Sequence, residues 1–227
     1  MSVTTKIENA AFIITVDPTR RIIKDGSLVV VDDRITKIGK AHEIRNTPAD
    51  RVIDGSDMVI TPGFLNGHMH ISYAHATRGI FPDDLGPAYY PHVFSLQAIM
   101  TPEEEYHTSL LALTELLKYG TTCFVDPGST RYLDACMQAY EDSGCRIMIG
   151  QQVLDQQPTM DLPVTSTEEA IAITEETIKK FDHRFNDRVR SWAVLSSAGD
   201  ASRELLLAAK GLADKYQTGL TMHHFNN

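Results

Sequence analysis

The sequence predicts an α/β protein in which a small β-domain precedes the first part of a (β/α)8 TIM-like barrel. Residues 1–57 read as short strands and turns with no competing helical period. From residue 58 to residue 227, strand patterns and helix patterns alternate strictly. Strict alternation indicates a parallel sheet whose strands are joined by crossover helices.

The number of elements sets how much of a barrel is present. We expect five strands and four helices after the β-domain, counting residues 58–66 as the first strand. A complete barrel has eight of each in about 250 residues. We therefore predict about five-eighths of a barrel, whose remaining strands come from a missing C-terminal part or from a second polypeptide. A five-stranded open α/β sheet is the alternative, which suits the count but not the motifs.

The β-domain is predicted from runs of β-branched and apolar residues that stop at turn residues. The first run ends at Asp17-Pro18 and the second at Asp32-Asp33, and the third follows the second as its hairpin partner. The predicted strands are residues 10–16, 26–31, 34–39 and 51–55.

The barrel helices carry start and stop signals. Thr101, Pro102 and Glu104 form an N-cap, a first-turn proline and a capping box, and Gly120 ends that helix. The later helices are expected from Leu133 to about Gly144, after Ser166, and from Glu204 to Tyr216. The strands between them are expected at residues 121–126, 146–150, 189–195 and 220–223.

Residues 71–100 read as a long loop after the first barrel strand, rich in aromatic residues and prolines. Loops of this length are usually functional or disordered, and disordered segments are poor in aromatic residues. We expect the loop to cover the mouth of the barrel, although a surface loop packed by its own aromatic side chains is the alternative. The candidate substrate-binding residues are Tyr73, His75, Phe81, Tyr89 and Tyr90, together with Gln152 just past the third strand.

Histidines follow the first and fifth barrel strands. His68 and His70 are two residues apart, so alternation along a strand points them to the same side. His223 and His224 end the fifth strand, and only one of them can face inward. Because the carboxyl ends of barrel strands meet at one face, these side chains should converge. Three histidines with one open position are typical of a catalytic zinc site, although imidazole also suits iron and cobalt.

The string from Thr61 to His70 resembles the Pro-Gly-Phe-hydrophobic-Asp/Asn-x-His-x-His signature of the amidohydrolase superfamily. The resemblance covers the whole chain and is strongest to the branch with triazine hydrolases, cytosine and guanine deaminases, and phenylurea and thiocarbamate hydrolases. It implies that residues 1–57 are part of a β-sandwich domain completed by C-terminal strands. It also implies that His68, His70 and His223 bind a divalent metal ion.

Two further ligands of the family, a histidine of strand six and an aspartate of strand eight, would lie beyond Asn227. The resemblance therefore implies that the chain alone is incomplete for activity. Family members with two metal ions use a lysine on strand four, and residues 189–197 contain none, so we expect one ion, most simply zinc.

Deaminases of this branch carry a glutamate three residues after the strand-five histidine, where this chain has Asn226. An amide can hydrogen-bond a carbonyl but cannot shuttle a proton. We therefore rank first a mononuclear hydrolase that cleaves a C–N or C–S bond of a small urea, amide or carbamate-like substrate, with Asn226 as a catalytic residue. The alternatives are a deaminase or dechlorinase of an N-heterocycle (triazine, pyrimidine or purine) and a non-catalytic barrel protein. Asn226 could instead simply cap the loop.

Composition narrows the partners. A net charge of −9 and an isoelectric point near 5.4 argue against a nucleic-acid surface. The sequence has no apolar run long enough to span a membrane. The three cysteines are an odd number, at spacings that suit neither a disulfide framework nor a metal finger. We therefore expect reduced thiols and a cytoplasmic protein. We expect a small-molecule substrate and a homo-oligomer.

Overall fold

Two units make up the chain in the computed structural model, Met1–Gly63 and Phe64–Asn227. The structure describes residues 2–128, 130–158 and 162–224. Within these ranges, none of the helices is both long and apolar enough to cross a lipid bilayer.

The first unit is a β-sheet with one short helix, α1 (Ala41–Ile44). Its strands pair in the order β3-β2-β1-β4, with β5 also on β1, and only β4 and β5 run parallel to β1. Ala10, Ile13, Ile23 and Leu28 form its core. The described residues of this unit form a single sheet, so the second layer of a sandwich stays a prediction. The strands are β1 (Thr4–Ile14), β2 (Ile22–Val31), β3 (Arg34–Lys40), β4 (Arg51–Asp54) and β5 (Val59–Ile60).

The predicted strand at 58–66 is wrong as a single element. Val59 and Ile60 pair with β1 in the first unit, and β6 (Phe64–Asn66) begins the second unit. Pro62 lies between them and has no N–H to donate to a sheet, so the run divides there.

The strands of the second unit are parallel and follow the order of the chain. One sheet has the order β10-β8-β7-β6, and a second has the order β12-β11-β9. Because β9 continues β8 and β11 continues β10, consecutive strands are neighbours from β6 to β12. This order is that of a barrel, since doubly wound open sheets reverse direction within the sheet. The strands are β7 (Thr121–Val125), β8 (Arg146–Ile149), β9 (Gln152–Val153), β10 (Val189–Ser191), β11 (Ala193–Ser197) and β12 (Leu220–His223).

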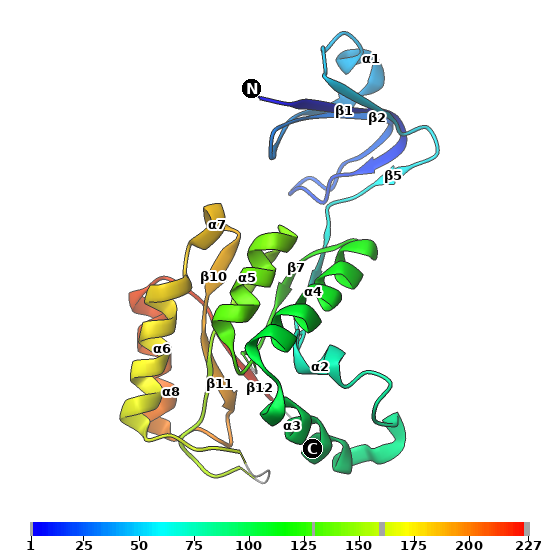
Figure 1. Ribbon diagram of the computed structural model, residues 1–227. Coiled ribbons are helices and arrows are strands. Elements are labelled where there is room, and N and C mark those ends of the chain that lie inside the picture. The colour runs from blue at the N-terminus through cyan, green and yellow to red at the C-terminus, as the bar shows by residue number, and fades with distance from the viewer. Residues whose placement is uncertain (1, 129, 159–161, 225–227) are drawn as a thin grey trace. The chain divides into compact units, whose positions relative to one another are not determined.

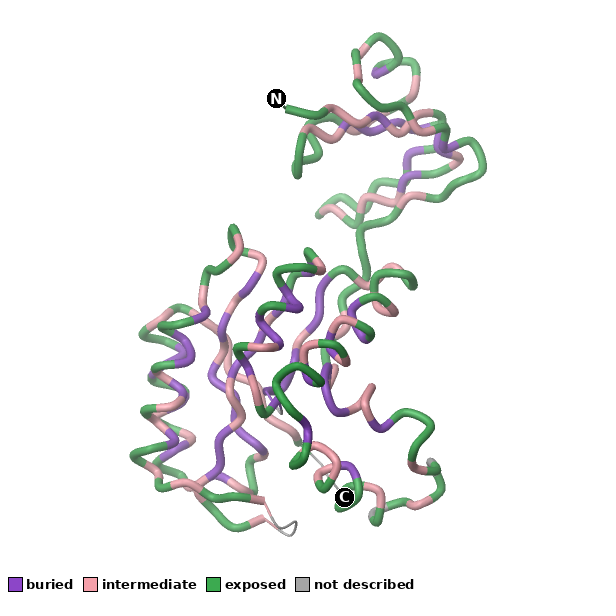
Figure 2. The backbone as a smooth tube through the Cα atoms, viewed as in Figure 1, coloured by how far each residue is buried: buried purple, intermediate pink, exposed green. Residues whose placement is uncertain are grey.

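The helices lie along this sheet, with α4 beside α5 and α6 beside α8 (Figure 1). The predicted starts are confirmed, because Thr101 and Ser166 accept hydrogen bonds from backbone N–H groups in the first turns of α4 and α6. Buried residues gather on the strands and on the inner helix faces (Figure 2). Leu113, Phe124, Tyr140 and Ile147 are almost completely buried in the main core. The helices are α4 (Pro102–Lys118), α5 (Leu133–Ser143), α6 (Thr167–Phe181), α7 (Arg184–Asp187) and α8 (Arg203–Lys215).

The expectation of a structureless loop at 71–100 is wrong. The segment contains α2 (Tyr73–Ala76), the 3-10 helix η1 (Asp83–Ala88) and α3 (Tyr89–Ile99). Pro91 lies in the first turn of α3, where a missing N–H costs no helical hydrogen bond. Apolar residues occur all around α3, so the sequence shows no amphipathic period there.

Candidate metal centre

Three histidine side chains converge at the carboxyl ends of β6 and β12. The Nε2 atoms of His68 and His70 are 3.1 Å apart, and those of His70 and His223 are 3.2 Å apart. One nitrogen from each residue lies within 4.8 Å of the others. The structure thus brings together the side chains that the sequence analysis proposed as metal ligands.

Backbone contacts fix the histidine pair after β6. The side chain of Asn66 accepts a hydrogen bond from the His68 N–H at 3.1 Å. The Met69 N–H donates to the Val125 carbonyl at 2.9 Å, which extends the pairing with β7 beyond the last residue of β6. Met69 packs against the main core, so its neighbours on either side face away from the helices.

His223 is oriented by a carbonyl on the neighbouring strand. Its Nδ1 lies 2.8 Å from the carbonyl oxygen of Ser196, and a carbonyl can only accept. Nδ1 therefore carries the proton, which leaves a lone pair on Nε2 toward His70. A hydrogen bond from the ring nitrogen that does not bind the metal sets the tautomer and orientation of a metal-binding histidine. No side-chain pattern indicates this contact in advance, because the backbone of Ser196 makes it.

The surroundings of His68 and His70 disfavour the charged form of both rings. Burial, followed by the proximity of His223 and His68, lowers the pKa of His70 to about 3. Burial and His223 also lower the pKa of His68. Neutral imidazole is the form that binds a metal ion, because the ligand nitrogen must offer a lone pair.

The residues present fit a divalent ion. Ligand nitrogens about 2.0–2.1 Å from a tetrahedral zinc ion lie roughly 3.3 Å apart, close to the two shorter separations. His70 Nε2 faces a nitrogen on each side but can share at most one proton, so hydrogen bonding alone leaves a repulsive contact. A cation among the three nitrogens removes that repulsion.

The substrate-binding candidates occupy different surroundings. The Tyr73 ring lies 5.3 Å from the ring of His70 and is itself buried. His75 instead faces the helix layer, with Nε2 2.9 Å from the Glu115 carboxylate on α4. The prediction that His75 contacts substrate therefore finds no support in its position. Its other ring nitrogen, Nδ1, is buried without a partner among the described residues.

The remaining candidates lie in other surroundings or outside the described residues. Phe81 and Tyr89 line a hollow of about 630 Å³, whereas Tyr90 is half exposed and packs near Phe94. Gln152 is part of β9 and donates its backbone N–H to the Gly128 carbonyl at 3.0 Å. The exposed His224 is not part of the histidine cluster. Asn226 lies outside the described residues.

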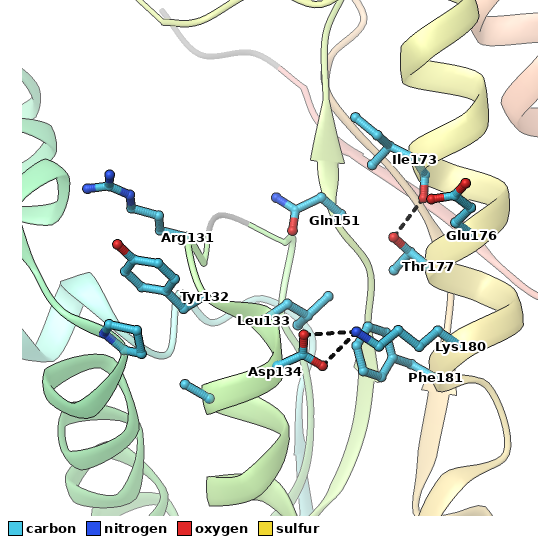
Figure 3. Close-up of a pocket in the computed structure, with 12 residues that line it drawn as sticks. Arg131, Tyr132, Leu133, Asp134, Gln151, Ile173, Glu176, Thr177, Lys180 and Phe181 are labelled. Atoms are coloured by element: carbon cyan, nitrogen blue, oxygen red, sulfur yellow. Dashed lines mark hydrogen bonds and ion pairs between the residues drawn. The ribbon is translucent and has the colours of Figure 1, made fainter.

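A second hollow, of about 460 Å³, lies between α5 and α6 (Figure 3). Arg131, Tyr132 and Gln151 border it on one side, and Thr177 and Lys180 on the other. None of the three clustered histidines lines it, so it is separate from the candidate metal centre.

Asp126, directly after β7, is a buried carboxyl group that the sequence analysis did not single out. It accepts hydrogen bonds from the Gly128 N–H at 2.9 Å and the Tyr140 hydroxyl at 3.1 Å. Burial raises its pKa to about 7. The position of Asp126 at the carboxyl end of a predicted barrel strand could have marked it as a candidate site residue.

The raised pKa of Asp126 predicts a pH-dependent stability. Unfolded, the carboxyl titrates near 3.8, so between pH 4 and pH 7 the folded state binds more protons. This group should therefore lower the free energy of unfolding as pH rises through that window, by at most about 1.4 kcal/mol per pH unit. Urea unfolding of the parent and of Asp126→Asn at several pH values isolates the effect. Equal pH slopes for the two proteins would contradict the prediction.

Residues 59–227 match the amidohydrolase family. The 5'-deoxyadenosine deaminase of Methanosarcina barkeri is 38% identical over 138 residues, which are 60% of this chain and 30% of that protein. The 5-methylthioadenosine/S-adenosylhomocysteine deaminase 1 of Syntrophus aciditrophicus is 30% identical over 220 residues, 95% of this chain and 47% of that protein. The chain thus spans about half or less of the length of these relatives.

Among solved structures, the atrazine chlorohydrolase TrzN from Arthrobacter aurescens TC1, complexed with zinc, superimposes with a TM-score of 0.84. The match covers 97% of this chain and 53% of that chain at 22% sequence identity. At this identity the likeness shows a shared fold, and it agrees with the barrel order of the strands.

Proposed function

The chain belongs to the amidohydrolase family, and we propose that it forms the first part of a metal-dependent deaminase acting on an adenine-type N-heterocycle. The convergence of His68, His70 and His223 is the observation that carries the proposal. The named relatives add support, because they are deaminases of 5'-deoxyadenosine and of 5-methylthioadenosine or S-adenosylhomocysteine.

The proposed reaction is a hydrolysis at a ring carbon. Water adds to the carbon that bears the amino group, the C–N bond breaks, and ammonia leaves while the ring retains the oxygen. When bound, a divalent ion supplies Lewis-acid chemistry that lowers the pKa of water and polarises the carbon centre. His68, His70 and His223 would hold that ion, and zinc is our choice because TrzN is complexed with zinc.

The protein residues have distinct tasks in this proposal. The Ser196 carbonyl holds the Nδ1 proton of His223, so that Nε2 stays available as a ligand. The low pKa of His70 keeps its ring neutral at physiological pH. Tyr73, packed beside His70, supplies an aromatic edge suited to a planar ring.

Among the candidate substrates, an aminated heterocycle thus ranks above a urea, amide or carbamate. Asn226 had favoured a urea, amide or carbamate substrate, whereas the relatives support hydrolysis at a heterocycle better. A urea hydrolase remains the second candidate, because an asparagine three residues after His223 cannot shuttle a proton as a glutamate does.

An assay of the full-length enzyme with zinc separates the two candidates. The substrates are 5'-deoxyadenosine, 5'-methylthioadenosine, guanine, an aminotriazine and an N-aryl-N',N'-dimethylurea. We expect ammonia release from at least one aminated ring and no aniline from the urea. Aniline release without ammonia from any ring would establish the second candidate and refute the deaminase.

Asn226→Ala tests whether that residue serves catalysis under either candidate. We expect kcat/KM to fall by about ten- to a thousandfold, the range for loss of a polar contact in a site, while the bound zinc stays unchanged. Activity equal to that of the parent would mean that Asn226 only caps the loop.

A further inference from the structure

A fully buried carboxylate lies in the first turn of α4. The Glu105 side chain is 0% exposed and accepts three hydrogen bonds. Its Oε1 receives the Ser72 hydroxyl at 2.8 Å and the Arg131 N–H at 2.9 Å, and its Oε2 receives the Tyr132 N–H at 2.5 Å. Burying a charge is unfavourable unless donors surround it, and these donors fulfil that need.

The donors to Glu105 come from two different loops. Ser72 lies between the metal-ligand candidate His70 and helix α2. Arg131 and Tyr132 lie directly before α5, in the loop that follows β7. Both loops leave the carboxyl ends of parallel strands, so one carboxylate in the helix layer joins two loops at the active-site face of the barrel.

The Arg131 side chain extends this connection to a third point. Its guanidinium donates to the Ala98 carbonyl near the end of α3. The same group lies over the Tyr132 ring, 5.3 Å from its centroid, at the edge of the hollow between α5 and α6 (Figure 3). The segment 71–100 is therefore held near its start at Ser72 and near its end at Ala98.

This segment brings Tyr73 to the histidine cluster. The Tyr73 ring lies 5.3 Å from the His70 ring and 6.0 Å from the ring of Phe94 on α3. Fixing the two ends of the segment thus fixes the aromatic edge next to the candidate metal centre. An apolar side chain at position 105 could fill the core but could not hold two backbone N–H groups and a hydroxyl.

We propose that Glu105 is a positioning residue, whose carboxylate holds segment 71–100, and with it Tyr73, in place beside the metal centre. Glu105 contacts neither the histidines nor substrate in this role and acts through Ser72, Arg131 and Tyr132. The expected change in KM rests on the proposed function. The expected change in hydrogen exchange of residues 71–100 rests only on the hydrogen bonds that Glu105 accepts.

The test compares Glu105→Gln with the parent in the full-length zinc protein. The amide keeps the size of the side chain but turns one acceptor into a donor that faces backbone N–H groups. We expect hydrogen–deuterium exchange in residues 71–100 to rise about tenfold or more, with exchange in β7 and β8 unchanged. Zinc content should stay equal, and KM for the adenine-type substrate should rise about tenfold with a smaller change in kcat.

Glu103→Gln is the matched control, because Glu103 lies in the same helical turn with an exposed side chain. It should leave exchange and kinetics unchanged. Ser72→Ala removes one of the three donors and leaves the N–H groups of Arg131 and Tyr132 on the Glu105 carboxylate. It therefore provides the test even if Glu105→Gln fails to fold. We expect it to raise exchange in residues 71–82 and to raise KM.

Different results overturn the two proposals. A rise in exchange spread evenly over the second unit, or unchanged exchange in residues 71–100 in both Glu105→Gln and Ser72→Ala, would overturn the positioning role. Failure of the parent to release ammonia from any aminated ring would overturn the deaminase. The exchange and zinc measurements would still decide the role of Glu105 in that case.

Discussion

His70→Ala should abolish metal binding and lower kcat/KM of the full-length enzyme at least about a thousandfold. The Nε2 of His70 lies between those of His68 and His223, at 3.1 and 3.2 Å, so its removal takes away the central ligand. A bound metal ion contributes several kcal/mol to the stabilisation of a transition state, and each 1.4 kcal/mol corresponds to a factor of ten in rate. Elemental analysis and steady-state kinetics measure the two effects.

Thermal unfolding gives a readout of this prediction that is independent of activity. Zinc should raise the melting temperature of the parent, because a ligand that binds only the folded state stabilises it, and it should not raise that of His70→Ala. His224→Ala is the control, since this exposed neighbour lies outside the cluster. Full zinc occupancy in His70→Ala would show that the cluster is not the metal site.

The helices of the barrel could be predicted because their signals are local. Thr101 and Glu104 each accept the backbone N–H of the other, and Ser166 accepts the N–H of Glu169 three residues later. Gly144 ends α5 in the left-handed conformation, with φ of 76°, which glycine adopts without strain. Such contacts depend on a few neighbouring residues, so the sequence contains all the information needed.

Sequence patterns say least where distant residues decide the structure. His75 was expected to contact substrate, and this role stays a prediction. In the structure its Nε2 lies 2.9 Å from Glu115, forty residues later on α4, and no local pattern indicates that pairing. The third barrel strand was expected to end at Gly150, but after a break at Gly150 and Gln151 it resumes as β9 (Gln152–Val153). A Cβ atom at Gly150 would lie 2.3 Å from the Trp192 carbonyl oxygen. The neighbouring strand therefore approaches too closely for any residue but glycine at the break between β8 and β9.

The histidine cluster could be predicted as a group, but its supports could not. Strand alternation and the common edge of a parallel barrel predict that His68 and His70 meet one of His223 and His224. The family resemblance implied His223, and the structure brings His68, His70 and His223 together. The Ser196 carbonyl and the Glu105 carboxylate act through contacts across 27 and 33 residues of chain, to His223 and Ser72. Such long-range contacts follow from the assembled fold and not from a short motif.

Gly128 connects two loops at the edge of the sheet that bears the histidines. Its N–H donates to Asp126 at 2.9 Å, and its carbonyl accepts the Gln152 N–H at 3.0 Å. The residue has φ of +78°, and a Cβ atom there would lie 2.2 Å from the Gly150 carbonyl oxygen and 2.7 Å from the Gln152 nitrogen. Both neighbours are backbone atoms, so neither can move without shifting β8 or β9.

Gly128→Ala should therefore destabilise the protein by about 2–5 kcal/mol, combining left-handed backbone strain of roughly 1–2 kcal/mol with overpacking of roughly 1–3 kcal/mol. Gly79→Ala is the matched control, because Gly79 has φ of +76° with nothing within 4 Å of the added atom. It should show only the backbone strain. Urea unfolding of the parent and both variants measures the difference, which reports the close approach of the two loops. Equal losses in the two variants would mean that the loop after β7 has room for a side chain, and that Gly128 is needed only for its backbone conformation.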